Sequence, residues 1–95
     1  MYARYLTFKS SPEHRDGIEA MADGMYEYIK TFQGFVSVTY VLSEDETTYG
    51  SFSVWETRQD ADNAGIALGE KLSGLLEGKA ASAPEVVTME VYSPG

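Results

Sequence analysis

The chain has 95 residues, with fifteen acidic against seven basic side chains for a formal net charge of −8, and no cysteine. The excess of acid disfavours a nucleic-acid partner, because such binding rests on Lys and Arg displacing counterions. The lack of cysteine excludes disulfides and thiolate chemistry. No apolar run approaches the roughly 20 residues of a membrane span, and the first residues lack the basic-then-apolar order of a signal peptide. We therefore expect one domain over residues 1–95, located in the cytoplasm and away from membranes.

The first third of the chain is predicted to form a strand followed by an amphipathic helix. Residues 2–9 are rich in β-formers and contain neither Gly nor Pro. Ser11 is placed to cap a helix whose first position is Pro12, where the missing N–H costs nothing. Apolar residues then recur at three- and four-residue steps from Ile18 to Phe32, as on one face of a helix. Gly34 is expected to end that helix.

The rest of the chain is predicted to form a hairpin, a second helix and a last strand. Residues 35–42 and 48–56 are β-rich and flank a short polar segment, so they are expected to pair. Residues 58–79 carry apolar side chains at helical spacing, and residues 86–92 form another β-rich run. The order β-α-β-β-α-β predicts an α+β fold of the ferredoxin-like, split β-α-β type. Its four-stranded antiparallel sheet is expected to carry both helices on one face.

Alternation along each strand divides the sheet residues between two faces. We assign to the helix-covered face Val36, Val38, Phe52, Val54, Val87 and Val91. The other face then carries Tyr2, Arg4, Leu6, Phe8, Phe35, Val41, Trp55 and Tyr92 among serines and threonines. An apolar and aromatic surface of this size is rarely left in water. We therefore expect a second copy of the chain to cover it in a symmetric homodimer. The same mixture of side chains also suits a small-molecule cavity.

Several segments of the chain resemble one protein family. Met1-Tyr2-Ala3-Arg4, Gly34-Phe35, Val54-Trp55-Glu56-Thr57-Arg58-Gln59-Asp60-Ala61 and Val91-Tyr92 resemble the antibiotic biosynthesis monooxygenase domain family, over essentially the whole chain. The resemblance implies a ferredoxin-like domain that dimerises into a dimeric α/β barrel. It also implies an oxygenase that needs no cofactor, in which a small phenolic or quinol substrate is deprotonated and itself donates electrons to dioxygen.

Two residues are candidates for catalysis, Trp55 from the resemblance and Arg4 from its charge and its place on the first strand. Trp55 matches the family's cavity-lining tryptophan, and Arg4 is the cation expected to stabilise an anionic substrate or intermediate. Further candidates for the pocket wall are Tyr2, Tyr40, Ser51, Ser53 and Tyr92, chosen for their hydroxyl groups. A structural interpretation competes with this one. In it Trp55 and the tyrosines are packing residues, and Arg4 pairs with Glu90 or Glu56 across the sheet.

Other functions fit the sequence less well. Relatives of this fold that degrade haem use a histidine on the second helix and an asparagine on the first strand, and neither is present; the single histidine, His14, lies at the start of the first helix. An RNA-binding sheet needs basic residues beside its aromatics. The run Glu44-Asp45-Glu46 is more typical of a solvated turn than of an acid–base site. The alternative function is a non-catalytic, dimeric small-molecule-binding or stress-associated protein of the same fold.

Overall fold

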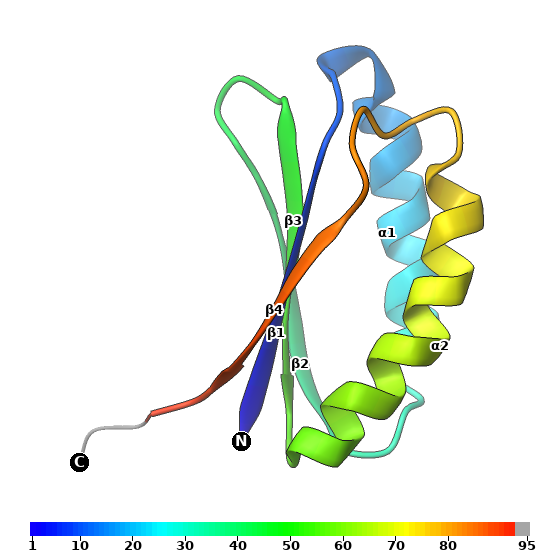
Figure 1. Ribbon diagram of the computed structural model, residues 1–95. Coiled ribbons are helices and arrows are strands. Elements are labelled where there is room, and N and C mark those ends of the chain that lie inside the picture. Colours follow the sequence, from blue (N-terminus) through cyan, green and yellow to red (C-terminus); the bar gives the residue numbers. More distant parts are fainter. Residues whose placement is uncertain (93–95) are drawn as a thin grey trace.

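A computed structural model describes residues 1–92 of the chain. The chain forms β1 (Tyr2–Lys9), a 3₁₀ turn (Pro12–His14), α1 (Arg15–Ile29), β2 (Phe35–Leu42), β3 (Thr48–Trp55), α2 (Arg58–Leu76) and β4 (Glu85–Glu90). The strands pair antiparallel in the order β2-β3-β1-β4. Both helices lie on the same side of this sheet (Figure 1). The predicted α+β, ferredoxin-like architecture is confirmed.

The helix ends are set by contacts that differ from those expected. Ser11 makes no side-chain capping hydrogen bond, and the chain makes its 3₁₀ turn before α1 begins. α1 ends at Ile29, five residues before Gly34. At the start of α2, Thr57 acts as the cap, because its hydroxyl accepts a hydrogen bond from the Asp60 backbone N–H at 3.1 Å.

Gly34 closes the turn between α1 and β2 against the start of α2. Its φ is +80°, a conformation that residues with a side chain rarely adopt. Its carbonyl accepts a hydrogen bond from the Glu56 N–H at 2.8 Å. A Cβ atom built on Gly34 would overlap the side chain of Asp60. The absence of a side chain at residue 34 therefore allows these two segments to pack together.

The structure reverses the two sheet faces that alternation assigned. Trp55 lies in the core under the helices with 0% of its surface exposed, and Phe8 and Tyr49 are buried on the same face at the other end of the strands. Phe52 and Val87, predicted to be in that core, are 38% and 54% exposed. The helix side also carries Tyr2, Leu6, Phe35 and the correctly predicted Val38, all packed against the core. Val41 lies on the uncovered side as predicted, whereas Val54 lies there against the prediction. Val36 is 42% exposed at the irregular start of β2, and Val91 and Tyr92 lie past the end of β4.

Two features explain the reversal. Strands β1 and β3 carry large apolar side chains on both faces, so the period of two predicts which residues share a face but not which face is covered. In β2 the pairing with β3 is irregular between Phe35 and Ser37. This bulge adds one residue to the strand and brings Phe35 and Val38 to the same side.

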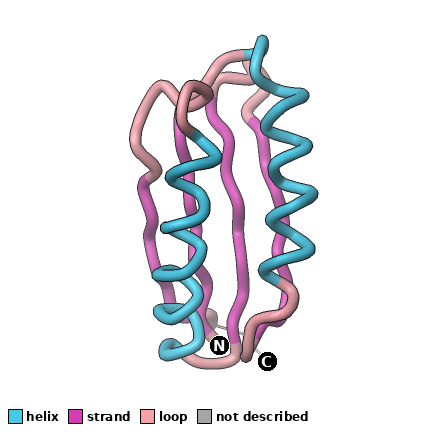
Figure 2. Tube along the Cα trace, turned by 90° about the vertical axis from the view of Figure 1, so that its right-hand side faces the viewer, coloured by secondary structure: helices cyan, strands magenta, loops and turns pink. Residues whose placement is uncertain are grey.

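The two helices stand apart over the sheet and make little contact with each other (Figure 2). Their inner stripes are apolar: Ile18, Met25 and Ile29 of α1 are buried, as are Leu68, Leu72 and Leu76 of α2. None of the helices within residues 1–92 is long and apolar enough to cross a bilayer. The space that the helices leave above the sheet holds the candidate site.

Candidate functional site

A cavity of about 300 Å³ lies between α1, α2 and the helix-facing side of the sheet. Small-molecule sites typically have volumes of roughly 300–1,000 Å³ and mostly apolar walls with few polar groups. The apolar part of this wall includes Leu6, Phe8, Ile18, Met21, Met25, Ile29, Val38, Leu68 and Leu72. The polar part consists of Arg4, Arg15, Glu19, Tyr40, Ser51 and Ser53. The composition of the cavity is that of a site for an apolar ligand with one or two polar groups.

The structure brings four of the predicted site residues together: Arg4, Tyr40, Ser51 and Ser53 all line the cavity. It places the cavity within a single chain, under the helices, and not on the uncovered sheet face where we expected it. Tyr2 packs against the core beside the cavity without lining it. Tyr92 is 77% exposed and lies beyond β4.

Trp55 reaches the cavity only through a hydrogen bond. Its indole ring lies against Phe32 and Phe35, with ring centroids 6.4 and 5.8 Å from its own. Its Nε1–H donates to the hydroxyl of Ser53 at 3.0 Å. Ser53 lines the cavity, and its hydroxyl also donates a long hydrogen bond of 3.5 Å to the Arg4 carbonyl. Trp55 thus fixes the orientation of a polar group in the wall while its own ring belongs to the core.

Arg4 is a partly buried cation without a partner carboxylate among residues 1–92. The pairs with Glu90 or Glu56 considered from the sequence are not formed in this part of the chain. Burial lowers the pKa of Arg4, and the negative charge of Asp62 acts in the opposite direction. A guanidinium remains protonated at neutral pH even so. The cavity therefore has a positive charge in its wall that no carboxylate of residues 1–92 pairs with directly.

Tyr40 lies at the edge of the cavity and is 41% exposed. Burial raises the pKa of Tyr40, and the nearby Asp23 and Tyr26 act in the same direction. The phenol consequently stays protonated at neutral pH and is available as a hydrogen-bond donor. Together with Ser51, directly across from it in the sheet register, it supplies hydroxyl groups to one side of the cavity.

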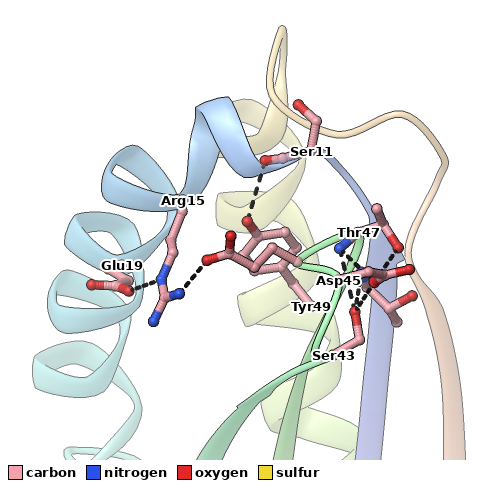
Figure 3. A network of polar contacts seen from close by, with 9 residues as sticks. Ser11, Arg15, Glu19, Ser43, Asp45, Thr47 and Tyr49 are labelled. Carbon is pink, nitrogen blue, oxygen red and sulfur yellow. Dashed lines mark hydrogen bonds and ion pairs between the residues drawn. The ribbon is translucent and has the colours of Figure 1, made fainter.

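A second set of polar side chains lies at the end of the cavity where α1 meets the β2–β3 hairpin (Figure 3). Arg15 donates hydrogen bonds to Glu19, at 2.7 Å, and to Glu46 of the hairpin loop. These two carboxylates raise the pKa of Arg15. The Tyr49 hydroxyl donates to the Ser11 carbonyl at 3.2 Å. Sequence reasoning missed Arg15 as a cavity residue; its spacing of four from Glu19 predicts a helix-surface ion pair but not the contact with the hairpin.

The acidic run of the hairpin loop forms a turn, as the sequence indicated. Asp45 accepts hydrogen bonds from the Ser43 hydroxyl at 2.7 Å and from the Thr47 hydroxyl and N–H at 2.7 and 3.1 Å. These bonds lower the pKa of Asp45. All three bonds go to Oδ1, which holds the loop in its turn, and Asp45 does not line the cavity.

The chain was compared with known proteins. No protein-family model matches it, and no curated protein does. A solved monooxygenase from Streptomyces coelicolor, in complex with the ligand Nanaomycin D, is 28% identical, with a TM-score of 0.74 over 98% of this chain and 88% of that one. A protein from Nitrosomonas europaea, provisionally assigned as an antibiotic biosynthesis monooxygenase, has a TM-score of 0.83 at 15% identity over 98% of this chain and 100% of that one.

A further antibiotic biosynthesis monooxygenase has a TM-score of 0.79 at 15% identity, again over 98% of this chain and 100% of that one. These alignments span nearly the whole chain and all its elements. The resemblance found in the sequence is therefore confirmed, and the chain has the fold of the antibiotic biosynthesis monooxygenases.

Proposed function

We propose that this protein is a monooxygenase that oxidises a small phenolic or quinol substrate in the cavity between helices and sheet, without a bound cofactor. The observation that carries the proposal is the unpaired Arg4 in the wall of a mostly apolar cavity of about 300 Å³. The Streptomyces coelicolor monooxygenase, which shares the fold and was solved with a bound small ligand, supports the same class of reaction.

In the proposed reaction the substrate supplies the electrons. The phenol loses its proton to solvent, and the positive charge of Arg4 stabilises the phenolate, most strongly where water is excluded. The phenolate passes an electron to dioxygen, and the two radicals combine at a ring carbon. The peroxide anion takes a proton back from solvent, and its O–O bond then breaks as the hydrogen on the same ring carbon is lost as a proton to the departing hydroxide. A quinone and one molecule of water result, so that one oxygen atom enters the product and the other leaves in water. The apolar wall from α1 and α2 keeps the reacting ring away from bulk solvent.

The polar groups around Arg4 orient the substrate in this proposal. Tyr40 and Ser51 donate hydrogen bonds to oxygen atoms of the substrate. Trp55 acts as a positioning residue through its hydrogen bond to Ser53, and not by contact with the ring.

Oxygen uptake tests the reaction. With 1-naphthol, naphthoquinols and anthrone as substrates, uptake is expected without added flavin or metal. Arg4→Met, which keeps the stem of the side chain but removes the charge, is expected to lower kcat/KM by about tenfold to a hundredfold. Trp55→Phe should lower it less. Arg58→Met is the matched control, because Arg58 has a 69% exposed side chain on the outer surface of α2.

Two results would count against the proposal. If Arg4→Met takes up oxygen as fast as the native protein, the positive charge of Arg4 has no part in the reaction. Binding of these compounds with no uptake in any of them would favour the non-catalytic binding protein instead.

We also propose that the protein works as a homodimer, with a second copy of the chain covering the free sheet face. The residues on this face differ from those we expected, because Trp55 and Arg4 lie under the helices. Its exposed apolar side chains are Tyr5, Val41, Phe52, Val87 and Met89. Tyr5 and Phe52 pack side by side at 6.1 Å between ring centroids. Small domains that leave such a patch in water are uncommon.

A further inference from the structure

The guanidinium of Arg4 lies directly against the backbone of Gly65 in α2. A Cβ atom at residue 65 would come within 3.1 Å of Nη2 and 3.2 Å of both Cζ and Nε of Arg4. Such distances are shorter than ordinary van der Waals contacts between carbon and nitrogen. One turn further along α2, a Cβ atom at Gly69 would meet nothing within 4 Å. A side chain at residue 65 would therefore require the guanidinium to shift by a few tenths of an ångström.

Arg4 stands in a wall between two spaces. On one side is the cavity; on the other is a more open groove bounded by α2, the connection over residues 77–84 and the start of β4. Leu6 and Leu72 line both spaces and complete the wall. The groove gives the guanidinium access to solvent, so its charge need not be paired inside the protein. Gly65 lines the groove and lies against the guanidinium on that side of the wall.

An anionic ligand in this cavity depends strongly on the charge of Arg4. The net charge of −8 repels anions at a distance. The other cation at the cavity, Arg15, already donates to Glu19 and Glu46. Within residues 1–92, Arg4 is the cation of the cavity wall whose charge is not taken up by a carboxylate. Discrimination between an anion and a neutral molecule of the same shape therefore depends on where its guanidinium lies.

We infer that Gly65 is a positioning residue for Arg4, and that the pair makes the cavity select aromatic anions, such as carboxylates or phenolates, over neutral aromatic molecules of the same shape. A side chain at residue 65 displaces the guanidinium. Moved toward the cavity it fills space that the ligand needs; moved toward the groove it leaves the ligand's charge without a partner. The inference rests on the cavity of the proposed function, but it concerns binding and not oxygen chemistry.

Two matched probes test the inference: 2-naphthoate, an anion, and 2-naphthamide, its neutral analogue of nearly the same shape. Isothermal titration calorimetry of the native protein is expected to give a dissociation constant for 2-naphthoate at least about tenfold lower than for 2-naphthamide. In Gly65→Ala the affinity for 2-naphthoate should fall about tenfold, while that for 2-naphthamide changes less than about threefold. Gly69→Ala is the control in the same helix and should leave both constants unchanged.

A double substitution separates positioning from a general effect on α2. When Arg4→Met has removed the guanidinium, Gly65→Ala should have no further effect on 2-naphthoate binding. A persisting effect in that background, or an equal loss for both probes in Gly65→Ala alone, would overturn the inference.

The native protein gives a test that does not depend on any variant folding. Equal affinity for 2-naphthoate and 2-naphthamide would overturn the inference. The two proposals also fail differently. Selectivity for the anion without oxygen uptake would overturn only the monooxygenase reaction, whereas uptake without selectivity would overturn only the role of Gly65 and Arg4 described here.

Discussion

Trp55 shows how a residue can belong to the core and still affect the cavity. Its ring is completely buried, and its indole N–H ends on the hydroxyl of Ser53. The residue type and its place at the end of a strand were enough to single it out in the sequence. The burial of the ring could not be predicted from the sequence around Trp55. It depends on Phe32, in the turn after α1, and on Phe35, in the neighbouring strand, which both pack on the ring. Arg4, Tyr40, Ser51 and Ser53 were chosen for their chemistry and do share one cavity.

Asp45 provides a pH-dependent prediction for a single residue. Its folded pKa is lowered by hydrogen bonds from Ser43 and Thr47. A carboxyl whose pKa is lower in the folded than in the unfolded state stabilises the fold above the unfolded value, about 3.9. This contribution is lost as the pH falls through the lowered folded value. We expect an NMR titration to find the pKa of Asp45 below 3.9.

Asp45→Asn is the matched variant, since the amide keeps an acceptor oxygen but does not ionise in this range. Its free energy of unfolding should fall less than that of the native protein between pH 5 and pH 2. Identical acid dependence in the two proteins would contradict the prediction.

At the scale of elements, the strand and helix pattern was predictable and the covered side of the sheet was not. β1 and β2 have the predicted bounds, and the other elements end within a few residues of theirs. Phe52 and Trp55 are both suitable core residues, three positions apart on opposite faces of β3. Which of them is buried depends on where α1 and α2 return over the sheet, and no local pattern in β3 records this. The bulge in β2 could not be predicted from the sequence of β2 either, because it arises from the pairing with β3.

The two kinds of glycine in these elements predict opposite effects on stability. Gly34→Ala combines a positive φ with overlap on Asp60, so it should lower the free energy of unfolding by more than about 1 kcal/mol. Gly69→Ala lies inside α2 with open space around the new methyl group, so it should raise that free energy by about 0.5–1 kcal/mol. Urea unfolding followed by circular dichroism measures both. If Gly34→Ala and Gly69→Ala changed the free energy of unfolding in the same direction, the different roles given to the two glycines would be wrong.

At the scale of the whole molecule, the layered arrangement leaves one sheet face for a second copy. Phe52 lies on that face and is 38% exposed. Phe52→Glu should convert the dimer to a monomer at micromolar concentration, because it would bury a charge in the interface. Sedimentation velocity measures the change. Ile66→Glu is the control, since Ile66 is 68% exposed on α2 and its replacement should leave the dimer intact. A native protein that sediments as a monomer would rule out the proposed homodimer.

The contact of Gly34 with Asp60 also has an evolutionary consequence. Gly34-Phe35 and the segment from Trp55 to Ala61 are short stretches, and each alone identifies little. In the folded chain the two stretches are in contact, and the side chain at residue 60 fills the space that a side chain at residue 34 would need. Among natural sequences with this fold the two positions should therefore co-vary. A descendant that gains a side chain at the first position should have lost one at the second, and an alignment of homologues, with no purified protein at all, would record that exchange.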